Sequence, residues 1–497
     1  MTKLSVWKEA GAVFVLCAAM AIAAPGQTFN TLVEFDGPDG ANPQSVLVQG
    51  ADGSFYGTTT TGGVNGGGTV FKINAGGTLT TIYNFCSQAN CADGDYPTTS
   101  FVLGTDGNFY GTTAYGGTHC CGTVFKLTPG GNLATLYSFC SQFNCSDGAN
   151  PYAGVAEGID GNFYGTTYQG GKCSQLGGCG TIFKVTSRGE FTSLYSFCPH
   201  VTAKMSSCPD GDEPESWLAQ AIDGNFYGTT SNGGSDDGGG NGTVFRITTA
   251  GKFTPLYSFG ANGSGTNPAA GLVQALDGSL YGTTFWGGVG QFGFGTVFKV
   301  TLGGTQSTLY AFAGGSDGGH PLAGLVQATD GNFYGTTYTG GPYSHNCAYE
   351  GCGTIFEITP VGGNLVTLHS FNFSVDGGNP TAGLLQATNG IFYGTTWGGG
   401  RFFCKYGCGT IFSLDMGLGP FVAFVQAAGK VGQTGGILGQ GFTGTTSVSL
   451  NGTPASFTVV SDTFIRATVP AGATTGYVTV TTPSGALTSN IPFHVIR

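Results

Sequence analysis

Short segments in which apolar and small polar residues alternate fill most of the chain, and tight-turn dipeptides separate these segments. Ala323 to Ala328 ends at Asp330-Gly331, where glycine accepts the positive φ of a hairpin without a steric cost. Asn332 to Thr337 and Gly353 to Thr359 follow, and a fourth segment such as Leu309 to Phe312 ends each unit. A period of two predicts strands rather than helices. We therefore predict an all-β fold.

The unit of four strands recurs along the chain. Phe-Tyr-Gly-Thr-Thr or a close variant follows an Asp-Gly or Asn-Gly turn and precedes a Gly-Gly pair and then Gly-Thr-[Val/Ile]-Phe. The tyrosines of this phrase are Tyr56, Tyr110, Tyr164, Tyr227, Tyr281, Tyr334 and Tyr393. Four strands in roughly 54 residues are typical of a propeller blade, whereas β-solenoid coils are shorter and contain no hairpin. We predict a seven-bladed β-propeller over residues 27–416.

The ends of the repeat array predict how this propeller closes. The fourth strand follows the first six repeats but not the seventh, and a matching segment, Phe29 to Phe35, stands before the first repeat. We expect this N-terminal strand to complete the seventh blade, because an open ring would leave an unpaired strand edge.

Two family resemblances rest on these residues. The unit Asp-Gly-Asn-Phe-Tyr-Gly-Thr-Thr, then Gly-Gly, then Gly-Thr-Val-Phe-Lys, resembles the tandem repeat of bacterial GloVer-type (Gloeo_Verruco) proteins over about residues 28–415. Gly441-Phe442, Asn451-Gly452, Val469-Pro470 and Gly476 to Val480 resemble an IPT/TIG domain. The first resemblance implies export and the repeat architecture but no reaction. The second implies an immunoglobulin-like β-sandwich over residues 417–497.

The N-terminus reads as a signal peptide. Lys3 and Lys8 precede an apolar run from Gly11 to Ala24, which is too short to span a bilayer, and Ala21 and Ala23 form a cleavage pattern. We predict a signal peptide over residues 1–26, no transmembrane helix in the mature chain, and a secreted or cell-surface protein. The net charge of -11 disfavours nucleic acid as a partner.

The cysteines are predicted to form disulfides on one rim of the propeller. Fifteen are present, and fourteen remain without Cys17 of the signal peptide. An even number in an exported chain, with no C-x-x-C spacing, favours disulfides over zinc sites. The candidates, all in connections that emerge at the same rim, are Cys86 with Cys91, Cys140 with Cys145, Cys198 with Cys208, Cys173 with Cys179, Cys347 with Cys352, Cys404 with Cys408, and a vicinal pair of Cys120 with Cys121.

The same rim carries the candidate ligand-binding residues. Variable loops and large rings on a rigid scaffold are where binding resides, although such rings also pack between blades. Trp286 and Trp397 are the predicted anchors, because other repeats place Thr60, Ala114 or Ser231 at nearly corresponding positions. The candidates that follow the second strand are Trp286, Trp397, Tyr338, Tyr168 and Tyr115.

No catalytic, metal or cofactor site is predicted. The histidines are scattered without H-E-x-x-H or G-x-S-x-G contexts, and the recurring Asp-Gly turns offer mostly one carboxylate each. Asp210, Asp212 and Glu213, or Asp236 with Asp237, are the groups left open for calcium. We expect a non-catalytic binding or structural protein that recognises a glycan or a surface protein. The alternative is a secreted polysaccharide hydrolase or lyase, and the oligomeric state stays open.

Overall fold

Strands make up almost the whole structure. The computed structural model describes residues 26–98, 101–173, 178–199, 208–234, 240–260, 263–288, 293–342, 347, 351–400, 404 and 407–496. Within these ranges the helical elements are two short 3-10 turns, η1 (Ala89–Cys91) and η2 (Phe143–Cys145). The all-β prediction is confirmed, and all of the predicted signal peptide except Gly26 lies outside the described residues.

Each repeat forms an antiparallel sheet whose strands pair in chain order. The first strands are β3 (Val48–Gln49), β7 (Val102–Leu103), β11 (Ala156–Glu157), β15 (Ala219–Gln220), β19 (Val273–Gln274), β23 (Val326–Gln327) and β27 (Leu385–Gln386). The second strands are β4 (Phe55–Thr61), β8 (Phe109–Thr113), β12 (Phe163–Thr167), β16 (Phe226–Thr230), β20 (Leu280–Thr284), β24 (Phe333–Thr337) and β28 (Phe392–Thr396).

The third and fourth strands complete each sheet. The third strands are β5 (Thr69–Ile73), β9 (Thr123–Leu127), β13 (Thr181–Val185), β17 (Thr243–Ile247), β21 (Thr296–Val300), β25 (Thr354–Ile358) and β29 (Thr410–Asp415). The fourth strands of repeats one to six are β6 (Leu79–Asn84), β10 (Leu133–Ser138), β14 (Phe191–Ser196), β18 (Phe253–Ser258), β22 (Gln306–Ala311) and β26 (Leu365–Ser370). A short extra strand, β2 (Ala41–Pro43), also pairs with β4.

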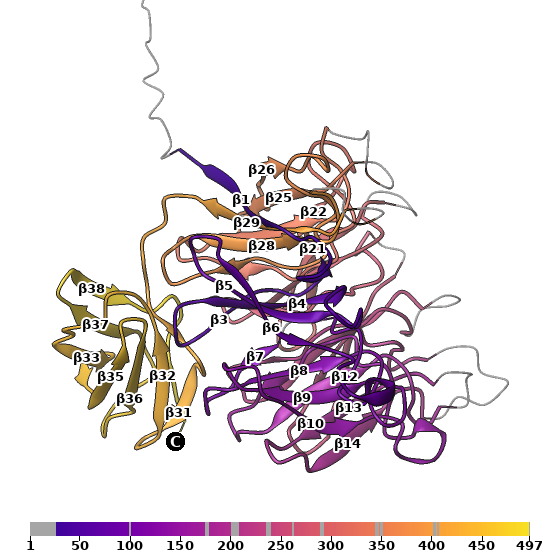
Figure 1. Ribbon diagram of the computed structural model, residues 1–497, viewed down its shortest axis with the longest axis horizontal. Helices are drawn as coiled ribbons and strands as arrows, with labels where there is room; N and C mark the ends of the chain where they lie inside the picture. The colour runs from indigo at the N-terminus through magenta and orange to yellow at the C-terminus, as the bar shows by residue number, and fades with distance from the viewer. Residues whose placement is uncertain are drawn as a thin grey trace, which may run out of the picture.

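The N-terminal strand β1 (Thr28–Glu34) supplies the fourth strand of the seventh sheet. It pairs antiparallel with β29, from Thr28 opposite Asp415 to Glu34 opposite Thr410, and Figure 1 shows the indigo β1 beside the orange β29. The predicted pairing of the N-terminal segment with the seventh repeat is confirmed.

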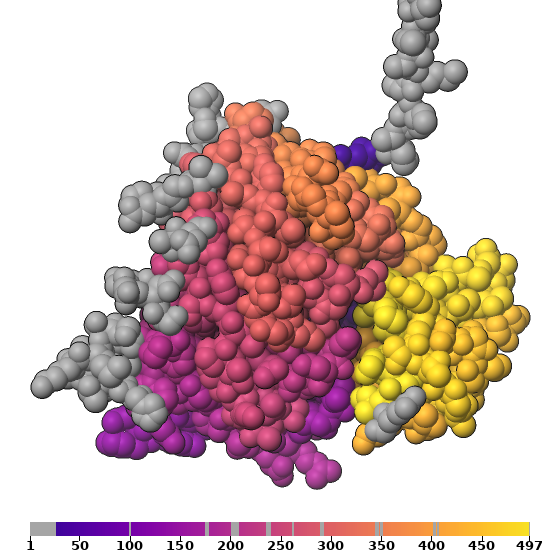
Figure 2. All heavy atoms as spheres, turned by 180° about the vertical axis from the view of Figure 1, so that it is seen from behind, coloured from indigo at the N-terminus to yellow at the C-terminus, as the bar shows by residue number. Residues whose placement is uncertain are grey.

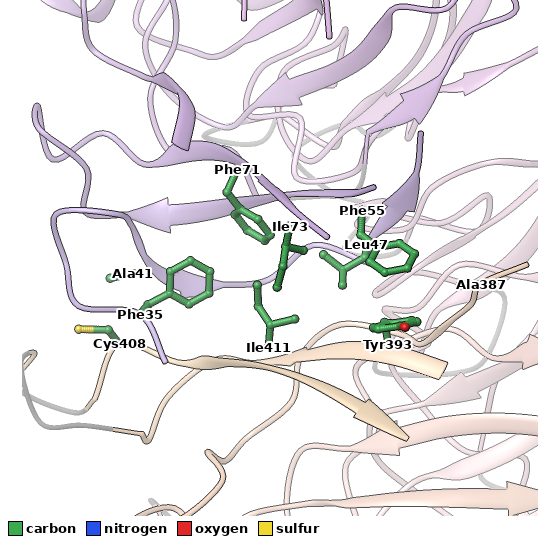
Figure 3. Packing of buried hydrophobic residues seen from close by; sticks show 10 residues of the cluster. All are labelled: Phe35, Ala41, Leu47, Phe55, Phe71, Ile73, Ala387, Tyr393, Cys408 and Ile411. Carbon is green, nitrogen blue, oxygen red and sulfur yellow. The ribbon is translucent and has the colours of Figure 1, made fainter. Parts of the chain in front are cut away.

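Consecutive sheets pack through the repeated Phe-Tyr phrase. The tyrosine of one second strand contacts the first aromatic ring of the next, except at Tyr227, where the next strand begins with Leu280. The ring centroids of Tyr393 of the last repeat and Phe55 of the first are 4.1 Å apart. Figure 3 shows these two rings in a buried cluster that joins the first and last repeats. The other ring pairs are Tyr56 with Phe109, Tyr110 with Phe163, Tyr164 with Phe226, Tyr281 with Phe333, and Tyr334 with Phe392.

In the Gly-Thr-Thr part of the phrase, the glycine leaves space for a ring and the threonine hydroxyls form buried hydrogen bonds. A Cβ at Gly57 would lie 2.4 Å from the ring of Phe71, so only glycine leaves room for that phenylalanine. The second threonine of each phrase shares a buried hydrogen bond with the third strand, as between Thr59 and Thr69 at 2.8 Å. In repeats two to seven the first threonine donates to a carbonyl of the adjoining repeat, as from Thr112 Oγ1 to Ala153 at 2.8 Å. These buried hydroxyls therefore hold strands and repeats in register.

The C-terminal region, residues 421–496, forms separate sheets around its own core. Val448, Ile465 and Val480 are among its buried residues, and Figure 2 shows the region in yellow as a lobe against the repeats. One sheet joins β30 (Ala423–Phe424), β32 (Thr434–Leu438), β36 (Phe464–Thr468) and β35 (Phe457–Ser461). The others join β34 (Thr453–Pro454), β33 (Ser447–Leu450), β37 (Val478–Thr482) and β38 (Gly485–Thr488), and, in parallel, β31 (Ala428–Lys430) and β39 (His494–Ile496).

This lobe packs against one end of the repeat sheets, which we call the turn end because the turns between first and second strands lie there. Thr463 Oγ1 donates to the carbonyl of Ala51 at 2.8 Å, and the side chain of Gln426 donates to the carbonyl of Gly158 at 2.9 Å. Phe464 and Leu438 of the lobe join the buried cluster of the first two repeats. In Figure 1 the lobe lies beside β3 and β7 accordingly.

Removing β1 should weaken the whole repeat region. A chain that begins at Asp36 loses the fully buried Phe35 and the stack of Phe29 on His369, whose ring centroids are 3.7 Å apart. Each large apolar side chain taken out of burial costs about 1.5–3 kcal/mol, and β29 would become an unpaired edge. We expect a lower Tm and aggregation in size-exclusion chromatography, compared with a chain that begins at Gln27. Equal melting temperatures for the two chains would contradict this role of β1.

Candidate functional site

The connections between fourth and first strands meet at the other end of the repeats, the connection end. Each carries a proline that packs on the glycine before a third strand of the preceding repeat: a Cβ at Gly122 would lie 2.6 Å from Cδ of Pro151. Backbone bridges such as Asp95 with Tyr115 join this connection to the segment after the second strand. The prolines are Pro43, Pro97, Pro151, Pro214, Pro268, Pro321 and Pro380.

A cavity of about 510 Å³, which we call the central cavity, lies among these connections. Every repeat contributes the residue that follows its proline, so the cavity lies where all seven sheets converge. These residues differ in size and polarity although the framework around them repeats. They are Gln44, Thr98, Tyr152, Glu215, Ala269, Leu322 and Thr381.

The indole of Trp217 forms the floor of the central cavity. Trp217 lies two residues beyond Glu215, in the direction of the turn end. A Cβ at Gly271 would lie 2.2 Å from Cε2 of Trp217, and a Cβ at Gly324 would lie 2.7 Å from its Cη2. These two glycines occupy the positions equivalent to Trp217 in the next two repeats. The indole therefore crosses the floor because its neighbours lack side chains.

Other rings form the wall of the cavity, and two of them were predicted as binding residues. Tyr338 and Trp397 line it together with Tyr96 and Tyr152, which the sequence did not single out. Large rings around a few polar groups are typical of small-molecule sites. The cavity thus combines aromatic faces with the side chains of Gln44 and Glu215.

The other three predicted residues lie away from the lining. The hydroxyls of Tyr115 and Tyr152 are 2.7 Å apart, and the ring centroid of Tyr168 is 5.2 Å from that of Tyr152, so both contact a lining residue. Trp286 is 41% exposed and packs on His320 with the ring centroids 4.4 Å apart. It belongs to a different aromatic cluster of the connection end.

Glu215 is the one carboxyl group among the described residues that line the cavity. Burial and then the charge of Glu213 raise the pKa of Glu215 to about 7. Burial and Glu213 likewise raise the pKa of nearby Asp212 to about 7. Within the described residues, no lysine, arginine or histidine lines the cavity.

The sequence pattern holds a signal for Trp217 and Glu215, which lie before the first strand and not in the segment after the second strand. Aligning the repeats on their prolines shows a variable position directly after each proline and a tryptophan where most repeats have glycine. Neither observation shows by itself that the residues after the seven prolines line one cavity, because these residues belong to different repeats.

Six of the predicted disulfides are present, and each joins residues four to ten apart. The pairs are Cys86 with Cys91, Cys140 with Cys145, Cys173 with Cys179, Cys198 with Cys208, Cys347 with Cys352, and Cys404 with Cys408.

The predicted vicinal bridge is wrong: Cys120 and Cys121 are free thiols, the first exposed and the second half-buried. Cys121 occupies the position of Cys179 in the next repeat, whose partner lies six residues before it, and repeat two lacks a cysteine at that distance.

The recurring Asp-Gly turns hold their carboxylates in local hydrogen bonds. Asp93 Oδ2 accepts from the hydroxyls of Tyr83 and Ser87 at 2.8 Å and from the backbone N–H of Ser87 at 3.0 Å. Asp210 accepts from the hydroxyl of Tyr195 and the N–H of Cys198. These contacts make the turns structural. Asp236 and Asp237 lie outside the described residues.

Two observations concern the cellular environment of the protein. Six disulfides fit an extracellular protein, because cytosolic reductants oppose them. In the part of the chain that the structure describes, no helix has the length and apolar character needed to cross a membrane.

Comparison with protein families shows to which family this chain belongs. The model of the Gloeobacter/Verrucomicrobia repeat matches residues 6–207, 140–275 and 214–459. The chain belongs to this repeat family. No curated protein matches the sequence.

Solved structures show what fold this member of the Gloeobacter/Verrucomicrobia repeat family shares. A fungal alcohol oxidase of the AA5 family, in complex with copper, is 15% identical with a TM-score of 0.50, over 93% of this chain and 98% of the oxidase. The extracellular domain of a one component system from B. thetaiotaomicron is 11% identical with a TM-score of 0.47, over 94% of this chain and 59% of its own. A gluconolactonase from Xanthomonas campestris is 12% identical with a TM-score of 0.37, covering 80% and 92%. The fold is propeller-like.

The central cavity does not offer the donors that copper prefers. Imidazole, thiolate and thioether groups suit copper, whereas the described lining presents phenols, one carboxylate, amide and hydroxyl groups. The likeness to the copper oxidase therefore extends to the fold alone.

The thiol count of the folded protein tests the cysteine assignment. In a chain that begins at Gln27, titration with a thiol reagent should give two free thiols, and Cys120→Ser should leave one. Removing a single bridge with Cys86→Ser and Cys91→Ser should leave the far-UV circular dichroism unchanged, because a short loop contributes only about 2 kcal/mol. Peptide mapping that found no free thiol, or bridges between repeats, would contradict the assignment.

Proposed function

We propose that this protein is an exported, non-catalytic binding protein whose central cavity takes the end of a glycan chain. In this proposal residues 1–26 are a cleaved signal peptide, residues 27–416 form a seven-bladed propeller, and residues 417–497 form an IPT/TIG immunoglobulin-like domain. The observation that carries the proposal is the Trp217 floor beneath a wall of rings and hydrogen-bonding side chains.

The closed propeller is supported by contacts between the first and last repeats. β1 pairs with β29, Tyr393 contacts Phe55, and Thr395 donates to the carbonyl of Ser45. A ring closed in this way leaves no sheet with a missing strand and holds all seven connections around one axis. The rigidity of the cavity wall follows from that closure.

The lining has the chemistry of a sugar site. A pyranose ring presents an apolar face of C–H groups, which stacks on an aromatic ring, and a rim of hydroxyls, which needs donors and acceptors. Trp217 supplies a flat ring, and Gln44, Thr98 and Glu215 supply polar groups around it. Thr381 also lines the cavity, and its hydroxyl is buried without a hydrogen-bond partner in the described structure.

The closed floor favours a chain end over a chain interior. Trp217 blocks the passage toward the turn end, and the C-terminal lobe covers turns of the first, third and seventh repeats there. A polysaccharide therefore has one entrance to the cavity and no exit. A concave site of this volume also suits a small ligand better than the flat surface of a protein partner.

An enzyme that hydrolyses glycosides is the weaker alternative. Hydrolysis of a glycosidic bond needs two carboxyl groups on opposite sides of the bond, and the described lining contains only Glu215. A lyase acting on uronates needs a group that neutralises the substrate carboxylate, and no basic residue is present among the described lining residues.

Substitution of the floor tests the proposal. Trp217→Ala should weaken binding to the glycans retained on an array by about 1–3 kcal/mol, or roughly 5- to 150-fold in Kd by calorimetry. Trp397→Ala should act in the same direction. Trp286→Ala is the matched control, because that tryptophan lies in another cluster, and its Kd should stay unchanged. An array without any retained glycan, or equal losses for Trp217 and Trp286, would refute the proposal.

A further inference from the structure

We infer that the central cavity selects glycan ends that carry a protonated amine, and that Glu215 and the surrounding aromatic faces form the site for this cation. The inference rests on the proposed glycan-binding function and names the chemical class of the sugar. It separates amino sugars from neutral sugars and from uronates.

The aromatic faces provide one half of the cation site. The face of an aromatic ring is electron-rich and attracts an ammonium group that lies over it. The indole of Trp217 lines the cavity, packed against Gly271 and Gly324, and Tyr152 and Trp397 also belong to the lining. A hydroxyl at the same place on a neutral sugar would gain no comparable attraction from these rings.

The carboxylate of Glu215 provides the other half. Glu215 follows Pro214 and lines the cavity, with Trp217 two residues beyond it. It takes part in no ion pair among the described residues. A buried carboxylate is costly unless a cation or several donors meet it. An ammonium group of the ligand would supply that missing charge.

The charges around Glu215 all have the same sign or are neutral. Glu213 and Asp212 precede it in the same connection, and the phenols of Tyr168 and Tyr152 lie on the neighbouring repeat. Among the described residues that line the cavity, none is basic. A uronate would therefore meet repulsion and an uncompensated buried charge.

The protonation of Glu215 gives the site a defined pH dependence. Burial and Glu213 raise the pKa of Glu215 to about 7 in the free protein, so the carboxyl group is neutral well below that pH and charged above it. The ligand amine, in turn, loses its proton at alkaline pH. Binding of an amino sugar should consequently pass through a maximum near neutral to mildly alkaline pH, whereas binding of a neutral sugar should change little.

A matched series of β-1,4-linked oligosaccharides tests the inference. The probes are glucosamine, N-acetylglucosamine and glucose oligomers of equal length, which differ only at the 2-substituent, together with a uronate oligomer. Calorimetry with the full chain should show the lowest Kd for the glucosamine oligomer, by about ten-fold or more over the glucose oligomer. The uronate oligomer should show no binding.

The variant Glu215→Gln separates charge from shape. It keeps the size of the side chain and a hydrogen-bonding group, so it should remove the preference for glucosamine and flatten the pH profile while neutral oligomers still bind. Glu157→Gln is the matched control, because Glu157 accepts from Thr105 away from the cavity, and it should keep the preference. Unchanged melting temperatures verify that both variants fold.

The outcomes distinguish this inference from the proposed function. Equal Kd values for the amino and neutral oligomers, a preference that survives in Glu215→Gln, or no glucosamine binding would overturn the amine selectivity. In those cases, retention of neutral glycans with loss in Trp217→Ala would leave the glycan-binding proposal standing. Failure of every glycan on the array would overturn both.

Discussion

The contact between a tyrosine of one repeat and the aromatic ring of the next is the interaction on which the rest of the structure depends. It recurs along the array and returns from Tyr393 to Phe55, so the last repeat packs on the first. Each tyrosine is held in place by its own turn, as Tyr334 is by the carboxylate of Asp330 at 2.8 Å. Because a single unit cannot bury both of its faces, only the complete array satisfies every copy of the contact.

The repeated packing leaves one position in each repeat, the residue after the connection proline, free to vary. The proline in each fourth-to-first connection is locked against a glycine of the preceding repeat, and the residue after it lies at the convergence of the sheets. Packing demands little of that residue, so glutamine, tyrosine, glutamate and leucine all occur there. The central cavity is thus lined by positions that packing leaves free to vary, and these positions are held on a rigid repeated framework. Ligand sites commonly lie on variable connections of this kind.

Trp217 and the C-terminal lobe both lie toward the turn end of the repeats. The indole occupies the space that glycine leaves at Gly271 and Gly324, and the lobe contacts the turn end at Ala51, Gly158 and Thr388. The cysteine-bearing connections lie at the opposite end, where short disulfides shape loops rather than hold repeats together.

The local pattern of the sequence was sufficient for the strands, the four-stranded unit, the pairing of β1 and six disulfides, because each depends on residues close in the chain or on a missing copy of a repeated strand. The free thiols of Cys120 and Cys121 already depend on a spacing that the repeat does not supply. Only the tertiary structure decided that Tyr338 and Trp397 share a cavity with Glu215 and Trp217 while Trp286 does not. The physical reason is that the cavity is lined by residues from different repeats, and no periodicity within a repeat encodes which side chains meet there.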